Sequence, residues 1–207
     1  MEIDFFFDTI CPWCYIGKRR LEQALAARKD QNISVNWCSF LLNPDLSPSG
    51  IDQDTYLSNK FGTESRIRRV YENISDVGLS VNIDFNFNII RRTPNSIDPH
   101  RLVHFAGAGG KSEIALDVLF KNYFIEGKNI GDVKVLMVIA KSIGLDTHAF
   151  SAHLESTDGI SEIYAANARA HSLGVGSVPS YVFNKRLVIS GAQEPNVLAS
   201  MLDAAMA

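Results

Sequence analysis

Cys11-Pro12-Trp13-Cys14 stands where an apolar segment gives way to a helical pattern, and this junction constrains the fold more than any other feature. The preceding segment, residues 3–7, is aromatic and typical of a strand. From Trp13 onward, apolar residues recur at helical spacing. Pro12 suits the first helical position, because its missing N–H would be unpaired there. The sequence therefore predicts two cysteines at the start of one helix, directly after a strand.

This placement favours redox chemistry of the two thiols. The partial positive charge at a helix N-terminus favours a thiolate on Cys11, so we expect Cys11 to be the nucleophile. Cys14 lies one turn further along and is expected to be the resolving thiol. The spacing lets Cys14 close onto Cys11 and release a substrate from a mixed disulfide.

Two other roles of a CxxC stay open, namely half of a zinc site and a pair of inert buried cysteines. A closed zinc site needs four ligands, and the remaining cysteine, Cys38, is solitary and expected to be a buried small residue. His100 and His104 have helical ligand spacing, but neither a Glu in the HExxH position nor a third ligand accompanies them. We therefore expect no metal site.

Composition indicates a globular protein. With 207 residues and 46% hydrophobic residues, the chain can bury a full core. A net charge of −3 argues against nucleic acid as a partner. The apolar run at residues 135–140 is too short to span a membrane, and no export signal is visible at the N-terminus. We expect a cytoplasmic protein, and in that compartment a CxxC is more typical of a cycling pair than of a structural disulfide.

The pattern along the chain changes twice. After the first helix, residues 33–40 alternate like a half-buried strand, which completes a β-α-β unit. Residues 54–154 then show helical patterns, and we expect residues 133–143, apolar on nearly all sides, to be the buried centre of this part. Residues 178–191 are typical of a hairpin, and residues 194–206 are predicted to form a closing helix.

Several short motifs connect this order of elements to a known family. They are Asp8 to Gly17 (DTICPWCYIG), Leu42 to Leu46 (LNPDL), Asn129-Ile130, Ser177-Val178-Pro179 and Ile189 to Gln193 (ISGAQ). With these motifs the chain resembles the DsbA-like thioredoxin proteins, and specifically their FrnE-type branch, over essentially its whole length. The expected fold class is α/β, a thioredoxin fold of residues 1–46 and 158–207 interrupted by an all-helical insertion of residues 47–157.

The resemblance implies a protein disulfide oxidoreductase that acts on protein or small-molecule disulfides through Cys11 and Cys14. Val178-Pro179 matches the cis-proline loop, which lies against the CxxC in this family. Its main chain would pair with an extended substrate, and Pro12 and Trp13 would complete the binding surface. The implied partners are protein thiols and disulfides or glutathione as a co-substrate, with no cofactor, in a monomer or homodimer.

Alternatives from other classes remain. Relatives on this scaffold include glutathione-dependent 2-hydroxychromene-2-carboxylate isomerases and kappa-class glutathione transferases, which typically carry serine at the position of Cys11. In such an enzyme Cys14 would be incidental, and in a redox-regulated binding protein or chaperone neither thiol would turn over. Retention of both cysteines favours dithiol chemistry. Asp8 has two interpretations, as a proton carrier for Cys14 or as a loop and capping residue.

Overall fold

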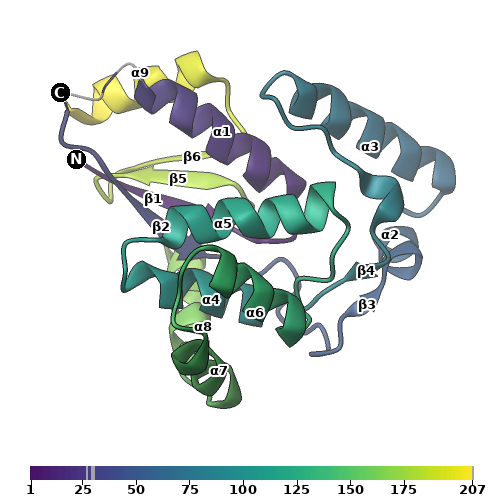
Figure 1. Cartoon of the computed structure of the whole chain (residues 1–207). Coiled ribbons are helices and arrows are strands. Elements are labelled where there is room, and N and C mark those ends of the chain that lie inside the picture. Colours follow the sequence, from purple (N-terminus) through teal and green to yellow (C-terminus); the bar gives the residue numbers. More distant parts are fainter. Residues whose placement is uncertain (27, 29–30, 207) are drawn as a thin grey trace. The chain divides into compact units, whose positions relative to one another are not determined.

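The computed structural model describes residues 1–26, 28 and 31–206 in two compact units. The first unit joins residues 1–42 to residues 162–207, and the second holds residues 43–161. The boundaries expected from the sequence lay at 46/47 and 157/158. The order of strands, CxxC helix and inserted helices is that of a DsbA-like thioredoxin fold (Figure 1).

A four-stranded mixed sheet forms the centre of the first unit, in the order β2-β1-β5-β6. β1 runs parallel to β2 and antiparallel to β5, and β6 pairs antiparallel with β5, which is the predicted hairpin. The elements of this unit are β1 (Glu2–Phe7), α1 (Pro12–Ala26), β2 (Ser34–Ser39), all but the start of α8 (Ile160–Ser172), β5 (Ser180–Phe183), β6 (Leu187–Ser190) and α9 (Pro195–Met206).

β1 is buried on both faces because helices cover each side of the sheet. Phe5 packs edge-on against Trp37 of β2 and Tyr181 of β5, with ring centroids 5.4 and 5.1 Å away. α1 lies over this face, beside α9 (Figure 1). On the other face, Asp4 forms a 2.8 Å ion pair with Arg169 of α8. The aromatic run in the sequence therefore becomes the middle of the core.

The second unit is helical, with one addition that the sequence did not indicate. A two-residue antiparallel ladder joins β3 to β4. The elements of this unit are β3 (Ile51–Asp52), α2 (Gln53–Phe61), α3 (Glu64–Leu79), the 3-10 turn η1 (Phe87–Ile89), β4 (Arg92–Thr93), α4 (Ile97–Gly107), α5 (Ser112–Phe120), the π-helical segment η2 (Lys121–Ile125), α6 (Val133–Ser142) and α7 (Thr147–Glu155).

The expectation that residues 133–143 form the buried centre of this unit was wrong. Only one face of α6 is buried, and Val138 on the other face is 63% exposed. Leu116 and Leu119 of α5 are fully buried instead. An apolar composition does not reveal how many faces of a helix find a neighbour, because this depends on the packing of the other helices.

Lys18 of α1 is a fully buried lysine whose charge is compensated locally. Its ammonium pairs with the Glu22 carboxylate one turn later and lies 5.3 Å from the centre of the Trp37 ring. Burial alone would raise the pKa of Glu22. The hydrogen bonds and charges of Lys18, and then of Arg19, outweigh burial, so the pKa of Glu22 lies below its usual value. Glu22 therefore stabilises the fold in its ionised form.

We predict that Glu22→Gln lowers the free energy of unfolding by about 1–3 kcal/mol at pH 7, because it removes the negative charge that pairs with the buried Lys18 ammonium. The folded-state pKa is lowered, so the contribution is present above the unfolded pKa of about 4.3 and is lost as pH falls through the folded value. Urea unfolding at pH 7 and pH 3 measures the difference. A wild-type advantage that is the same at both pH values would contradict an ionic origin.

Candidate functional site

The chain enters the candidate site through a tight turn between β1 and α1. The Asp8 carbonyl accepts a hydrogen bond from the Cys11 N–H at 3.1 Å, which closes the turn. α1 begins at Pro12, as the sequence predicted. This geometry puts Cys11 immediately before the helix and Cys14 within its first turn, so both sulfurs lie near the positive end of α1.

The two cysteines differ in access to solvent. Both are free thiols; Cys11 is 5% exposed and Cys14 is completely buried. Pro12 and Trp13 between them are only partly buried. Cys11 therefore keeps a small contact with solvent, whereas Cys14 has none.

The Val178-Pro179 segment lies against the CxxC within the first unit. The Cys11 thiol donates a hydrogen bond to the Val178 carbonyl oxygen, with a sulfur–oxygen distance of 3.6 Å. The peptide bond between Val178 and Pro179 is cis. Four of the residues predicted to form the site, Cys11, Cys14, Val178 and Pro179, thus gather around one helix end.

The surroundings of Cys14 disfavour its thiolate. Burial raises the pKa of Cys14 well above its usual value, and its hydrogen bond to Cys11 and the charge of Cys11 raise it further. The charge of Asp8 also raises this pKa, whereas a hydrogen bond from the Asp8 main chain lowers it. Cys14 therefore stays a thiol in the reduced protein.

Tyr181 of β5 joins α1 to the strand that follows Pro179. Its hydroxyl donates to the Gly17 carbonyl at 3.0 Å, and its side chain is fully buried. Burial raises the pKa of Tyr181, and the charge of Cys14 adds to this effect. A Cβ atom at Gly17 would lie 2.6 Å from the Tyr181 hydroxyl and 2.7 Å from Cγ of Pro179. The missing side chain at residue 17 allows this close packing.

Asp8 is completely buried at the end of β1. Its carboxylate accepts hydrogen bonds from the Ile10 N–H at 3.2 Å and from the Leu42 N–H at 2.7 Å. The loop interpretation of Asp8 therefore has a structural basis. Its effect on the ionisation of Cys14 leaves the proton-carrier interpretation open as well.

Two other residues singled out from the sequence are buried in their own elements. Cys38 on β2 is a buried thiol, 3.1 Å from an Arg169 nitrogen. Burial, and then the charge of Asp4, raise its pKa to about 12. His100 is fully buried in α4. Over residues 1–26, 28 and 31–206, no group of three or more His, Cys, Asp or Glu side chains is arranged to hold a metal ion.

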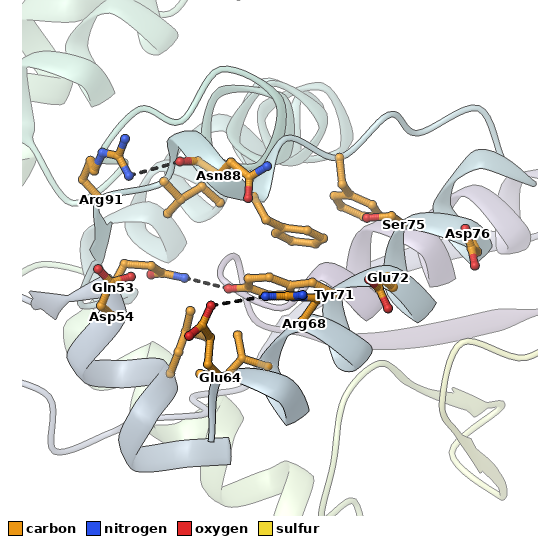
Figure 2. A pocket seen from close by; sticks show the side chains of 15 residues that line it. Gln53, Asp54, Glu64, Arg68, Tyr71, Glu72, Ser75, Asp76, Asn88 and Arg91 are labelled. Carbon is orange, nitrogen blue, oxygen red and sulfur yellow. Dashed lines mark hydrogen bonds and ion pairs between the residues drawn. The ribbon is translucent and has the colours of Figure 1, made fainter. Parts of the chain in front are cut away.

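A pocket of about 850 Å³ opens in the second unit (Figure 2). Tyr71 stacks on Phe87 with centroids 4.1 Å apart, and its hydroxyl accepts a 2.9 Å hydrogen bond from Gln53. Burial raises the pKa of Tyr71 to about 12. The lining contains neither cysteine nor histidine, so this pocket offers a place for a small molecule but no thiol chemistry. Its lining residues are Gln53, Asp54, Leu57, Glu64, Ile67, Arg68, Tyr71, Glu72, Ser75, Asp76, Phe85, Phe87, Asn88, Ile90 and Arg91.

Sequence reasoning missed Tyr181 and Gly17. A tyrosine in a strand carries no signal of what its hydroxyl contacts. Gly17 did carry one, because glycine inside a helix costs about 0.5–1 kcal/mol relative to alanine and often marks a close approach of another element. The partner, however, comes from a strand more than 160 residues away in the sequence.

Comparison with known proteins places these features in a family. Residues 2–203 match the DSBA-like thioredoxin domain. The uncharacterized protein YwbO of Bacillus subtilis (strain 168) is 28% identical over 156 residues, which are 75% of this chain and 72% of YwbO.

Solved structures agree with this match. The probable DsbA oxidoreductase SCO1869 from Streptomyces coelicolor superimposes with a TM-score of 0.93 at 28% identity, over 100% of this chain and 90% of that one. A 2-hydroxychromene-2-carboxylate isomerase gives a TM-score of 0.71 at 17% identity, over 100% and 94% of the two chains. At this identity the likeness to the isomerase extends to the fold alone.

We predict that Gly17→Ala destabilises the protein by about 1–3 kcal/mol, because the added methyl group overpacks the contact with Tyr181 and Pro179. Tyr181→Phe removes one of the two crowded atoms, so the double variant should lose less stability than the sum of the single variants. Urea unfolding of the four proteins completes the cycle. Strict additivity would contradict direct contact between residues 17 and 181.

We also predict that Cys38 resists alkylation in the folded protein. With a pKa of about 12, its thiolate fraction at pH 8 is far below that of an ordinary cysteine. Mass spectrometry after iodoacetamide treatment at pH 8 should find Cys38 modified only when denaturant is present. Rapid modification of Cys38 in the native protein would contradict its burial.

Proposed function

Because this chain belongs to the DSBA-like thioredoxin domain family, we propose that it is a thiol–disulfide oxidoreductase that acts on protein or small-molecule disulfides. Cys11 and Cys14 form its dithiol/disulfide couple. The observation that carries the proposal is the pair of free thiols at the start of α1, of which only Cys11 reaches solvent. The difference in access supports attack by Cys11 and resolution by Cys14.

The proposed reaction proceeds in two exchanges. The Cys11 thiolate attacks one sulfur of a substrate disulfide, and the other substrate sulfur leaves as a thiolate. Cys14 then attacks Cys11 in the mixed disulfide, and the second substrate thiolate leaves. The substrate gains two electrons and the enzyme is left with a Cys11–Cys14 disulfide. The reverse sequence oxidises a substrate dithiol, so the reduction potential of the pair decides the direction.

Substrate binding is assigned to the surface around Cys11. The Val178 carbonyl already accepts a hydrogen bond from the Cys11 thiol, and an extended substrate segment can pair with the same main chain by β-augmentation. Pro12 and Trp13 are partly exposed beside the sulfur, and Pro179 completes this surface. Recognition through main-chain groups allows a broad range of substrates.

The glutathione-dependent isomerase remains the alternative chemistry for this scaffold. It needs glutathione at Cys11 and no second thiol. This chain does have a second thiol, because Cys14 is present, fully buried and hydrogen-bonded to Cys11. This arrangement favours the dithiol couple. Glutathione then serves as a co-substrate that reduces or oxidises the pair, and the reaction needs no further cofactor.

Two finer assignments belong to the same proposal. We assign the chain to the FrnE-type branch on its motifs, and to the cytoplasm, where structural disulfides are rare. None of the helices in the described part of the chain has the length and apolarity needed to cross a membrane.

We predict that Cys14→Ser accumulates mixed disulfides with client proteins or glutathione through Cys11, because the attack still occurs and the resolving thiol is missing. Cys11→Ser should trap few adducts. Non-reducing gels and mass spectrometry of the purified variants measure both. Equal trapping by the two variants, or by neither, would contradict the attack-then-resolve order.

Saturable glutathione-dependent isomerisation that survives in Cys14→Ala would support the isomerase instead.

A further inference from the structure

The pocket of the second unit has the size and the lining of a small-molecule site. Its volume of about 850 Å³ falls in the range of about 300–1,000 Å³ that is usual for such sites. The apolar part of its lining includes four buried side chains, Leu57, Phe85, Phe87 and Ile90. All lining residues belong to residues 53–91, so a ligand bound here does not rest on the proposed redox function.

Three aromatic rings form a nearly parallel stack that ends at Tyr71 in the lining of this pocket (Figure 2). The ring centroids of Phe85 and Phe87 are 4.9 Å apart with an interplanar angle of 12°, and those of Phe87 and Tyr71 are 4.1 Å apart with an angle of 5°. Within the described part of the chain, Phe87 is the one ring that contacts Tyr71. A planar ring in the pocket can therefore continue the stack on Tyr71.

Hydrogen bonds hold Tyr71 in this position. Its hydroxyl accepts a hydrogen bond from the amide of the buried Gln53 at 2.9 Å, and Oε1 of Gln53 accepts one from the Thr93 hydroxyl at 2.6 Å. These bonds join α3 to α2 and β4. A side chain that is fixed before binding loses little conformational entropy when a ligand packs on it, so this site is organised in advance.

Two carboxylates of the lining are unfavourable for the helix that carries them. Glu72 and Asp76 are exposed and stand four residues apart on α3, where like charges repel, and Asp76 lies in the last turn, where the helix dipole disfavours an anion. Neither forms an ion pair with any residue that the structure describes. The other two carboxylates, Asp54 and Glu64, lie in the first turns of α2 and α3, where the dipole favours them. A positive charge between Glu72 and Asp76 would offset their repulsion.

The lining as a whole also favours a cation. Its four carboxylates outnumber its two guanidinium groups, one of which is already paired with a carboxylate. The other guanidinium, of Arg91, lies at the opposite end of the pocket from Asp76 (Figure 2). We propose that this pocket binds a small organic cation that carries a planar aromatic ring. The ring stacks on Tyr71, and the ammonium group lies between the carboxylates of Glu72 and Asp76.

Two probes of the same shape test this assignment in the full chain. They are 2-naphthylmethylamine, which is positively charged at pH 7, and 2-naphthalenemethanol, which is neutral. An NMR titration of the backbone amides gives affinity and location together. We expect the amine to shift signals within residues 53–91 with a dissociation constant of about 0.1–1 mM, as is usual for a ligand of this size. The alcohol should shift the same signals with about three- to tenfold lower affinity, because exposed charge pairs contribute modestly.

Variants separate the contributions of charge and ring. Glu72→Gln combined with Asp76→Asn should bind the amine only as tightly as the alcohol, and its affinity for the alcohol should not change. Asp45→Asn combined with Asp158→Asn is the matched control, because it changes the net charge equally at exposed residues outside the lining, and it should bind both probes like the wild type. Tyr71→Leu should weaken both probes by about two- to tenfold, whereas Tyr71→Phe keeps the ring and the binding.

Other outcomes overturn the proposal. Equal affinity of the wild type for amine and alcohol would exclude a cation site, and shifts centred outside residues 53–91 would place the ligand elsewhere. An equal loss of amine affinity in the control variant would mean that only net charge matters. A lower melting temperature of the Glu72→Gln and Asp76→Asn variant would contradict the repulsion between the two carboxylates. Should Tyr71→Leu fail to fold, the comparison of the two probes still decides.

Discussion

The close packing of α1 on β5, at Gly17 and Tyr181, sets the geometry on which the candidate site depends. The Tyr181 hydroxyl binds the Gly17 carbonyl, and the ring of Pro179 lies where a side chain at residue 17 would stand. α1 carries the cysteines, and β5 continues from Val178 and Pro179. One helix–strand contact therefore determines how far the thiols lie from the main chain proposed to bind substrate. Reactions between bound groups tolerate little error in such distances.

Three buried charges in the first unit are each compensated by a partner. Asp4 pairs with Arg169, Lys18 with Glu22, and Asp8 accepts two main-chain N–H groups. Replacing one partner leaves the other desolvated, which is costly. Lys18–Glu22 and Asp4–Arg169 flank the sheet and bear on stability, whereas Asp8 lies at the thiols. The same physical rule thus produces ion pairs in two places and a carboxylate held by main-chain N–H groups in the third.

Membership of the DSBA-like family explains the architecture. The finer chemistry depends on local surroundings. Two thiols in one helical turn differ because one keeps contact with solvent and the other is completely buried. That difference favours a thiol at Cys14 and reaction at Cys11 first. The second unit holds a pocket of its own with stacked aromatic rings, and its lining contains no cysteine (Figure 2).

The sequence by itself determined the local features: the strand before the CxxC, the helix that begins at Pro12, the hairpin and the interruption by helices. Periodicity, turn residues and motifs are short-range signals, so they can be recognised from the sequence alone. Only the tertiary structure decided that α6 exposes Val138, that β3 pairs with β4, and that Tyr181 and Asp8 meet the CxxC helix. Tyr181 and β3 have partners that lie far away in the chain. The exposure of Val138 and the burial of Asp8 depend on how the surrounding elements pack. Folding brings such groups together through packing, and no local sequence pattern predicts which of them will be in contact.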